Sequence, residues 1–65
     1  MIRTVIRCPN NMVMVFDRRG KQIPAYQSQY QKVKESILRD APPDAVFAHG
    51  FTPAGKPREI SSEEW

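Results

Sequence analysis

The sequence predicts a small α+β domain: a three-stranded antiparallel meander, one amphipathic helix packed on one sheet face, and a C-terminal β-hairpin, in the order βββαββ. Three observations predict this class: a turn pattern that occurs three times, one apolar stripe at helical spacing, and a strand-like segment that follows two prolines. The chain has only 65 residues. A chain of this length supports one hydrophobic core, so residues 1–65 are expected to form a single domain.

The turn pattern occurs at residues 8–11 (CPNN), 17–20 (DRRG) and 52–55 (TPAG). Each segment ends in Gly or Asn, which tolerate the left-handed backbone that completes a three-residue hairpin loop. Two segments carry Pro at the second place, where its fixed φ suits a type I turn, and the third opens with Asp, whose carboxylate accepts hydrogen bonds from the turn amides. Three β-hairpins are therefore expected.

The first two turns set a strand register. Cys8 should lie opposite Met12, and Val5 opposite Val15, so that each strand separates its side chains onto two faces. One face is larger and more apolar, and we expect it to be the core face. Its members are Ile2, Ile6, Cys8, Met12, Met14 and Phe16.

The other face of this meander carries valines beside a row of alternating charge. Arg3, Asp17 and Lys21 should lie side by side, where opposite charges on neighbouring strands contribute roughly 0.2–1 kcal/mol each. Because a face with several valines is costly to leave in water, a homodimer or a protein partner is expected to cover it.

The predicted helix follows from one apolar stripe with periodic spacing. The stripe consists of Tyr26, Tyr30, Val33, Ile37, Leu38 and Ala41. Ser28 and Gln31 match a capping box, whereas Pro24 would suit the first turn of a helix that begins earlier. Neither proline of the pair at 42–43 can continue the helix, which therefore ends before them.

Residues 45–51 are apolar on both faces and predict an interior strand, paired through the third turn with residues 56–61. Pro57 cannot donate to a ladder, which makes the second of these strands an edge. Phe47 and Phe51 share one face with His49. The two phenylalanines either join the core or form an exposed apolar strip at an interface.

The segment "DRRGK" is the strongest candidate for an anion contact. It has one glycine and is followed by a strand-like segment, so it lacks the several converging amides of a phosphate loop. Residues 1–34 nevertheless hold seven basic side chains against one acidic, while residues 35–65 hold three against six. The candidate contacts to nucleic acid are Arg3, Arg7, Arg18, Arg19 and Lys21.

No set of residues in the sequence predicts catalysis. His49 is the only histidine, and with Glu59 across the third turn it supplies too few ligands for zinc. Cys8 lies at the apolar end of a strand, where a small buried thiol is common, and it has no histidine at a defined spacing. We therefore expect no enzyme activity, no metal site and no cofactor.

The sequence thus favours a small non-enzymatic binding module that acts through protein–protein contacts or self-association; nucleic-acid binding through the basic hairpins is the alternative. The predicted protein interface consists of Val5, Val13, Val15, Ile23, Phe47 and Phe51. A single unpaired cysteine is typical of a reducing compartment and predicts the cytoplasm. No apolar run approaches the length of a membrane span, so no membrane contact is expected.

Overall fold

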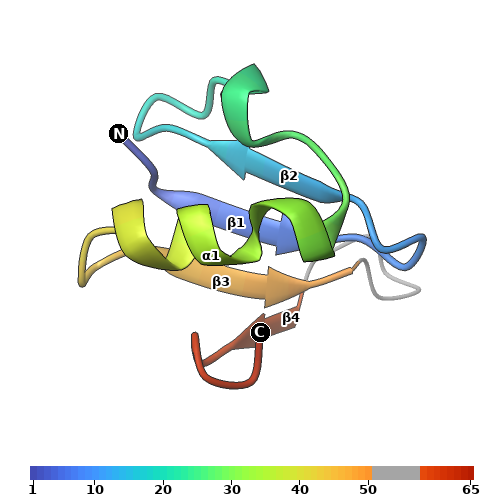
Figure 1. Cartoon of the computed structure of the whole chain (residues 1–65). Coiled ribbons are helices and arrows are strands. Elements are labelled where there is room, and N and C mark those ends of the chain that lie inside the picture. Colours follow the sequence, from blue (N-terminus) through green and yellow to red (C-terminus); the bar gives the residue numbers. More distant parts are fainter. Residues whose placement is uncertain (51–57) are drawn as a thin grey trace.

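The computed structural model describes residues 1–50 and 58–65 and shows a four-stranded mixed sheet with one α-helix against it (Figure 1). The elements are β1 (Thr4–Arg7), β2 (Val13–Phe16), the 3-10 helix η1 (Pro24–Tyr26), α1 (Tyr30–Asp40), β3 (Val46–His49) and β4 (Arg58–Ile60). The strand order is β2-β1-β3-β4. The small α+β class is therefore confirmed, while the arrangement of strands differs from the predicted meander.

The first hairpin forms in the predicted register. Val5 lies opposite Val15 in the antiparallel ladder of β1 and β2. The Cys8 amide donates to the Met12 carbonyl at 2.8 Å, and Asn11 adopts the left-handed backbone with a φ of 68°. Asn tolerates this conformation because its short polar side chain makes local hydrogen bonds.

The third strand of the predicted meander is absent from the described chain, so the prediction of three consecutive antiparallel strands is wrong. After the second turn, Phe16 and Gln22 form only an isolated bridge, and the Ile23 amide donates to the Val15 carbonyl at 2.8 Å. Pro24 then begins η1. Proline has no amide hydrogen to donate to a ladder, and its fixed φ suits the first turn of a helix, which ends the pairing here.

The centre of the sheet is a parallel pair, which the sequence did not predict. β3 lies beside β1 with Val5 opposite Phe47, and the chain between β2 and β3 crosses the sheet through α1. Parallel neighbours require such a long crossover, usually a helix. The predicted interior position of β3 and edge position of β4 are confirmed, whereas the third turn, at 52–55, lies outside the described residues.

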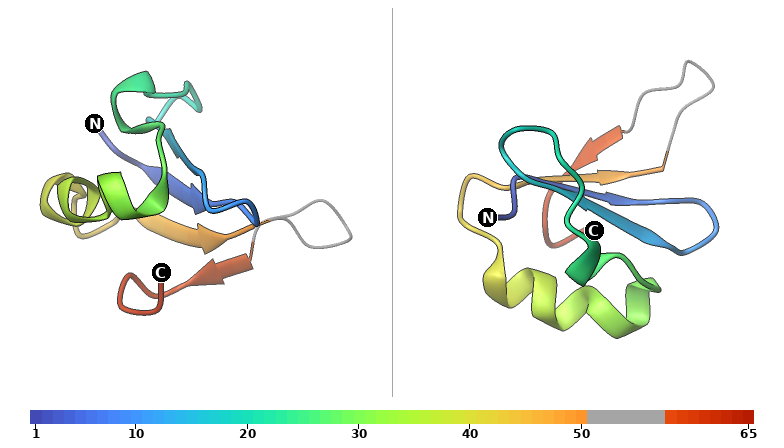
Figure 2. Two further views of the ribbon diagram at one scale, coloured as in Figure 1. Left: turned by 45° about the vertical axis from the view of Figure 1, so that its right-hand side comes forward. Right: turned by 90° about the horizontal axis from the view of Figure 1, so that it is seen from above.

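The core lies mainly on the sheet face opposite to the predicted one, although Ile2 of the predicted set belongs to the core cluster and Ile6 is buried. Val5, Val13 and Val15 are fully buried, whereas Met14 and Phe16 on the other face are only half-buried. Figure 2 shows the reason, since α1 and η1 both lie on one side of the sheet. The core cluster consists of Ile2, Val5, Val13, Val15, Val33, Ile37, Phe47 and Trp65. The large side chains that pack against the valines thus come from the helix and from aromatic residues far away in the sequence.

The helix α1 is shorter than the predicted stripe. It begins at Tyr30 with Gln29 as N-cap and no side-chain capping bond, so the predicted capping box at Ser28 is wrong. It ends before the proline pair as predicted, where the Ala41 amide donates to the Ile37 carbonyl at 2.8 Å. Leu38 departs from the stripe, since 41% of its surface is exposed.

Trp65 is a core residue to which the sequence assigned no role. Only 2% of its surface is exposed. Its ring meets those of Tyr30 and Phe47 edge to face, with ring centroids 5.1 and 5.2 Å apart, respectively. Aromatic pairs prefer this geometry, so Trp65 joins the start of α1 to the centre of the sheet.

We predict that Ile37→Ala destabilises the fold by about 2–5 kcal/mol, because it leaves a cavity where a fully buried side chain meets the sheet. Leu38→Ala is the matched control, with an expected loss below about 1 kcal/mol, since 41% of the surface of Leu38 is already exposed. Urea titrations followed by circular dichroism measure both free energies of unfolding. Equal losses for the two variants would contradict the helix orientation described here.

Candidate functional site

The residues predicted for a protein interface lie mainly in the core. Val5, Val13 and Val15 are fully buried and Phe47 nearly so, all on the face that α1 covers. Ile23 is half-buried against the same cluster. The helix therefore already covers the valine face for which a partner was expected. Phe51 lies outside the described residues.

The opposite face of the sheet has no helix over it in the described ranges (Figure 2). Its outward side chains alternate along each strand with those of the core. Those on β1, β2 and β3 are Thr4, Ile6, Met14, Phe16, Val46 and Ala48, which we call the open face. None of the six is charged; Ile6 and Ala48 are buried, and the other four are half-buried. Glu59 of β4 lies opposite Ala48 and is exposed, so a carboxylate stands at the β4 edge of this face. The open face is thus uncharged over β1, β2 and β3, and its bulky, partly exposed side chains lie on β2.

The two edges of the sheet offer a partner few free backbone groups. The outer edge of β2 is bonded to the following chain, where the Val13 amide donates to the Ser28 carbonyl and Ile23 donates to Val15, each at 2.8 Å. The other edge, β4, has three residues, of which Arg58 and Glu59 are exposed. Short, charged edge strands oppose the addition of another strand.

The segment "DRRG" is a tight turn, as predicted. Its own amides surround Asp17, whose Oδ1 accepts hydrogen bonds from the backbone of Arg19 and Lys21, both at 2.9 Å. The Gly20 amide donates to the Asp17 carbonyl at 3.0 Å, with a φ of 79° that favours glycine. The bond from the Lys21 amide is the main reason that the pKa of Asp17 lies below its ordinary value.

Asp17 and Lys21 lie opposite each other as predicted, but the charge pairing expected within the row of Arg3, Asp17 and Lys21 is not among the described ion pairs. Arg3 and Arg18 instead share Asp44, with nitrogen-to-Oδ2 distances of 3.3 and 2.9 Å. Asp44 lies in the turn before β3, and the parallel pairing brings this turn next to the start of β1. The carboxylate of Asp17 is directed to its own turn, which leaves Arg3 to pair elsewhere.

The five candidate nucleic-acid contacts thus fall into two groups. Arg3 and Arg18 are paired with Asp44, and Arg7 donates from Nε and Nη2 to Asn11 Oδ1 at 3.1 and 2.9 Å. Arg19 and Lys21 are exposed, and within the described residues no side-chain partner is found for either.

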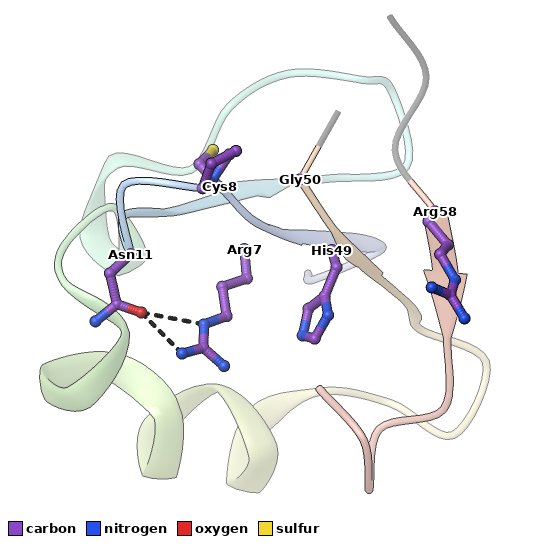
Figure 3. Close-up of a pocket in the computed structure, with 7 residues that line it drawn as sticks. Arg7, Cys8, Asn11, His49, Gly50 and Arg58 are labelled. Atoms are coloured by element: carbon purple, nitrogen blue, oxygen red, sulfur yellow. Dashed lines mark hydrogen bonds between the residues drawn. The ribbon is translucent and has the colours of Figure 1, made fainter. Parts of the chain in front are cut away.

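A row of basic side chains crosses the sheet where β1 and β3 end. Arg7 lies opposite His49, and His49 lies opposite Arg58. Figure 3 shows the three side chains extending to the same side of the sheet. The expected neighbour of His49 was Glu59, but in the observed register Glu59 pairs with Ala48.

A cavity of about 400 Å³ lies at these strand ends. Its described lining consists of Arg7, Cys8, Pro9, Asn11, His49, Gly50 and Arg58. Gly50 has a φ of 43°, and a Cβ placed on it would lie 3.4 Å from the Pro9 ring. Glycine therefore allows the end of β3 to approach the first turn closely.

Arg7 organises this end of the molecule. Its guanidinium lies 3.7 Å from the centroid of the Tyr30 ring, and Nη1 donates to the Trp65 backbone oxygen at 3.4 Å. His49 Nε2 lies 3.5 Å from the same oxygen. The first turn, the start of α1 and Trp65 are thus held together by one cation.

Within residues 1–50 and 58–65, Cys8 and His49 do not form a nucleophile–base pair. The sulfur of Cys8 points away from the His49 ring in Figure 3, and Cys8 is half-buried. Among the described residues no group of three or more metal-ligating side chains is close enough to hold an ion. None of the described helices has the length and apolar composition needed to cross a bilayer.

Comparison with known proteins gives no guide to function. No protein-family model matches the chain, and no curated protein and no solved structure is significantly similar to it. The functional argument therefore depends on the geometry of the two surfaces, the open face and the strand-end cavity.

The strand-end row was missed at the level of sequence because its members are far apart in the chain. Only the parallel register of β1 and β3 places Arg7 beside His49. The turn pattern at 8–11 marked the end of one strand, but nothing local in the sequence indicated its neighbour.

We predict that Asp17→Ala destabilises the fold at neutral pH and that this effect disappears in acid. A carboxyl with a lowered folded-state pKa stabilises the fold above its unfolded pKa, 3.8 here, and this contribution is lost as the pH falls through the folded value. Urea titrations of both proteins at about pH 6 and about pH 2 measure the difference. Glu35→Ala, an exposed change on α1, is the control. A difference that stays constant with pH would contradict the role of this carboxylate.

Proposed function

We propose that this chain is a small non-enzymatic binding module, and that its open face forms a protein–protein contact with a second copy of the chain. The observation that supports this is the uncharged open face, over which neither α1 nor η1 lies. A sheet normally buries each apolar face against another layer, and stacked sheets pack about 10 Å apart. A second sheet on the open face would complete such a sandwich.

The size of the chain supports a second copy as the occupant. Domains below roughly 70–80 residues rarely gain more than about 3–5 kcal/mol from one core, and oligomerisation is a common supplement. The six members of the open face carry no charge, and the exposed Glu59 lies at the β4 edge of the face, where the rim of a contact stays in water. The net charge of +3 opposes association only weakly, since salt screens exposed charges beyond about 8 Å.

The expected compartment is the cytoplasm. Cys8 is the only cysteine of the chain and is half-buried, so it has no partner in the same chain for a disulfide. Unpaired thiols persist where glutathione and thioredoxin keep them reduced.

We predict that Phe16→Lys weakens self-association, because it places a charge on the open face. Sedimentation equilibrium over a range from micromolar to millimolar chain measures it, with at least a tenfold weaker dimer expected for the variant, which corresponds to about 1.4 kcal/mol. The matched control is Leu38→Lys, since Leu38 is an exposed apolar side chain on α1, away from the open face.

Three outcomes separate the occupants. A dimer weakened by Phe16→Lys and unchanged by Leu38→Lys supports the proposal. A dimer sensitive only to Leu38→Lys would move the contact to α1 and overturn it. A strict monomer at all concentrations would remove the second copy and leave a different protein as the only occupant to consider.

Nucleic-acid binding through the basic hairpins is the second candidate, favoured by the exposure of Arg19 and Lys21 at the tip of the second turn. We predict that affinity for a labelled single-stranded oligonucleotide, if this function holds, falls steeply with salt and is weakened by Arg19→Glu. Lys32→Glu, an exposed change on α1, is the control for net charge. Fluorescence anisotropy at low salt measures both, and no binding by the unmodified chain would exclude this function.

A further inference from the structure

We propose that the strand-end cavity binds the oxyanion of a small molecule, a phosphate or carboxylate group, between Arg7, His49 and Arg58. This site is separate from the open face and goes beyond the function proposed above. Arg7 and His49 are the last residues of β1 and β3, which run in parallel. Ligands of open sheets commonly bind beyond the carboxyl ends of parallel strands, and this cavity lies at that position.

The charge of the lining favours an anion. Arg7, His49 and Arg58 lie on three adjacent strands at the cavity. No acidic side chain is among the described lining residues. Two guanidinium groups that border one cavity repel each other, and an anion between them would offset that repulsion. Asp44 provides a carboxylate for Arg3 and Arg18, whereas the described lining of the cavity contains no acidic side chain.

Two nitrogens at the cavity already lie near the same oxygen. Arg7 Nη1 and His49 Nε2 both approach the Trp65 backbone oxygen, at 3.4 and 3.5 Å, which is long for hydrogen bonds. Arg7 is held by Asn11 and by the Tyr30 ring, so its guanidinium is fixed before any ligand arrives. A fixed guanidinium loses little conformational entropy when it binds an oxyanion.

Arg58 supplies the second guanidinium. It begins β4 and is exposed, and its side chain has no hydrogen bond or ion pair within the described part of the chain. β1 and β4 lie two strand spacings apart, or about 10 Å. Two arginine side chains can therefore reach an oxyanion from opposite sides, with His49 between them (Figure 3).

The dimensions of the cavity suit a small organic anion. About 400 Å³ lies within the range of small-molecule sites, roughly 300–1,000 Å³. Pro9 and Gly50 add apolar surface beside the donors. This combination of apolar wall and a few convergent polar groups is typical of ligand pockets.

The test is a titration of the full chain with inorganic phosphate in one arm and acetate in the other, with sodium chloride at equal ionic strength as the blank. Backbone amide shifts by NMR report the site, and fluorescence of Trp65, the single tryptophan, provides a second readout beside Arg7 and His49. We expect saturable shifts at Arg7, His49 and Gly50, and the tighter arm identifies the oxyanion.

Arg58→Gln is the decisive variant because it removes an exposed charge without touching the core. We expect it to weaken binding about tenfold, the loss of one charge-assisted contact. Arg19→Gln, which removes an exposed arginine outside the cavity, should leave the affinity unchanged. Linear shifts without saturation, no response to Arg58→Gln, or an equal response to Arg19→Gln would each overturn the proposal.

The same titration on Phe16→Lys separates this site from the open face. If phosphate or acetate binds that variant as well as it binds the unmodified chain, the cavity is complete within one copy, as proposed. Binding that occurs only in an associated form would overturn a site built from Arg7, His49 and Arg58 of one chain.

Discussion

The parallel pairing of β1 with β3 is the constraint on which the rest of this structure depends. Parallel neighbours cannot be joined by a tight turn, so the chain must cross one face of the sheet between β2 and β3. That crossover contains α1, and the face that it crosses becomes the core. The same pairing leaves the other face without a helix in the part of the chain that the structure describes, and it places Arg7 beside His49 at the strand ends.

The core is assembled from small strand residues and large residues supplied by other elements. Val5, Val13 and Val15 form the buried face of the sheet, against which Ile37 and Trp65 pack. β-Branched side chains suit this position because their χ1 angles are already restricted and they pack well on a pleated surface. Met14 and Phe16 of β2 are left on the open face, where their half-buried side chains remain available for contact with another protein.

The arginines differ in whether a carboxylate lies near them in the fold, and this does not follow from their position in the sequence. The Asp17 carboxylate is satisfied by amides of its own turn, so Arg3 and Arg18 turn to Asp44. Exposed ion pairs of this kind contribute little stability, a median of about 0–1 kcal/mol. These ion pairs matter for binding instead, because they neutralise the charges of Arg3 and Arg18 near the N-terminal hairpin. Arg7 and Arg58, by contrast, line the strand-end cavity.

The sequence by itself determined the local features: the turns at 8–11 and 17–20, the register of Val5 with Val15, the helix and its end before the prolines, and the edge position of β4. These depend on backbone preferences of a few neighbouring residues. Only the tertiary structure decided which sheet face is the core, that β3 enters beside β1, and that Trp65 closes the core. Both faces of the hairpin are apolar, so hydrophobicity alone does not choose between them; the path of the crossover does. The strand-end row has the same origin, because residues 42 positions apart meet only when two distant strands pair.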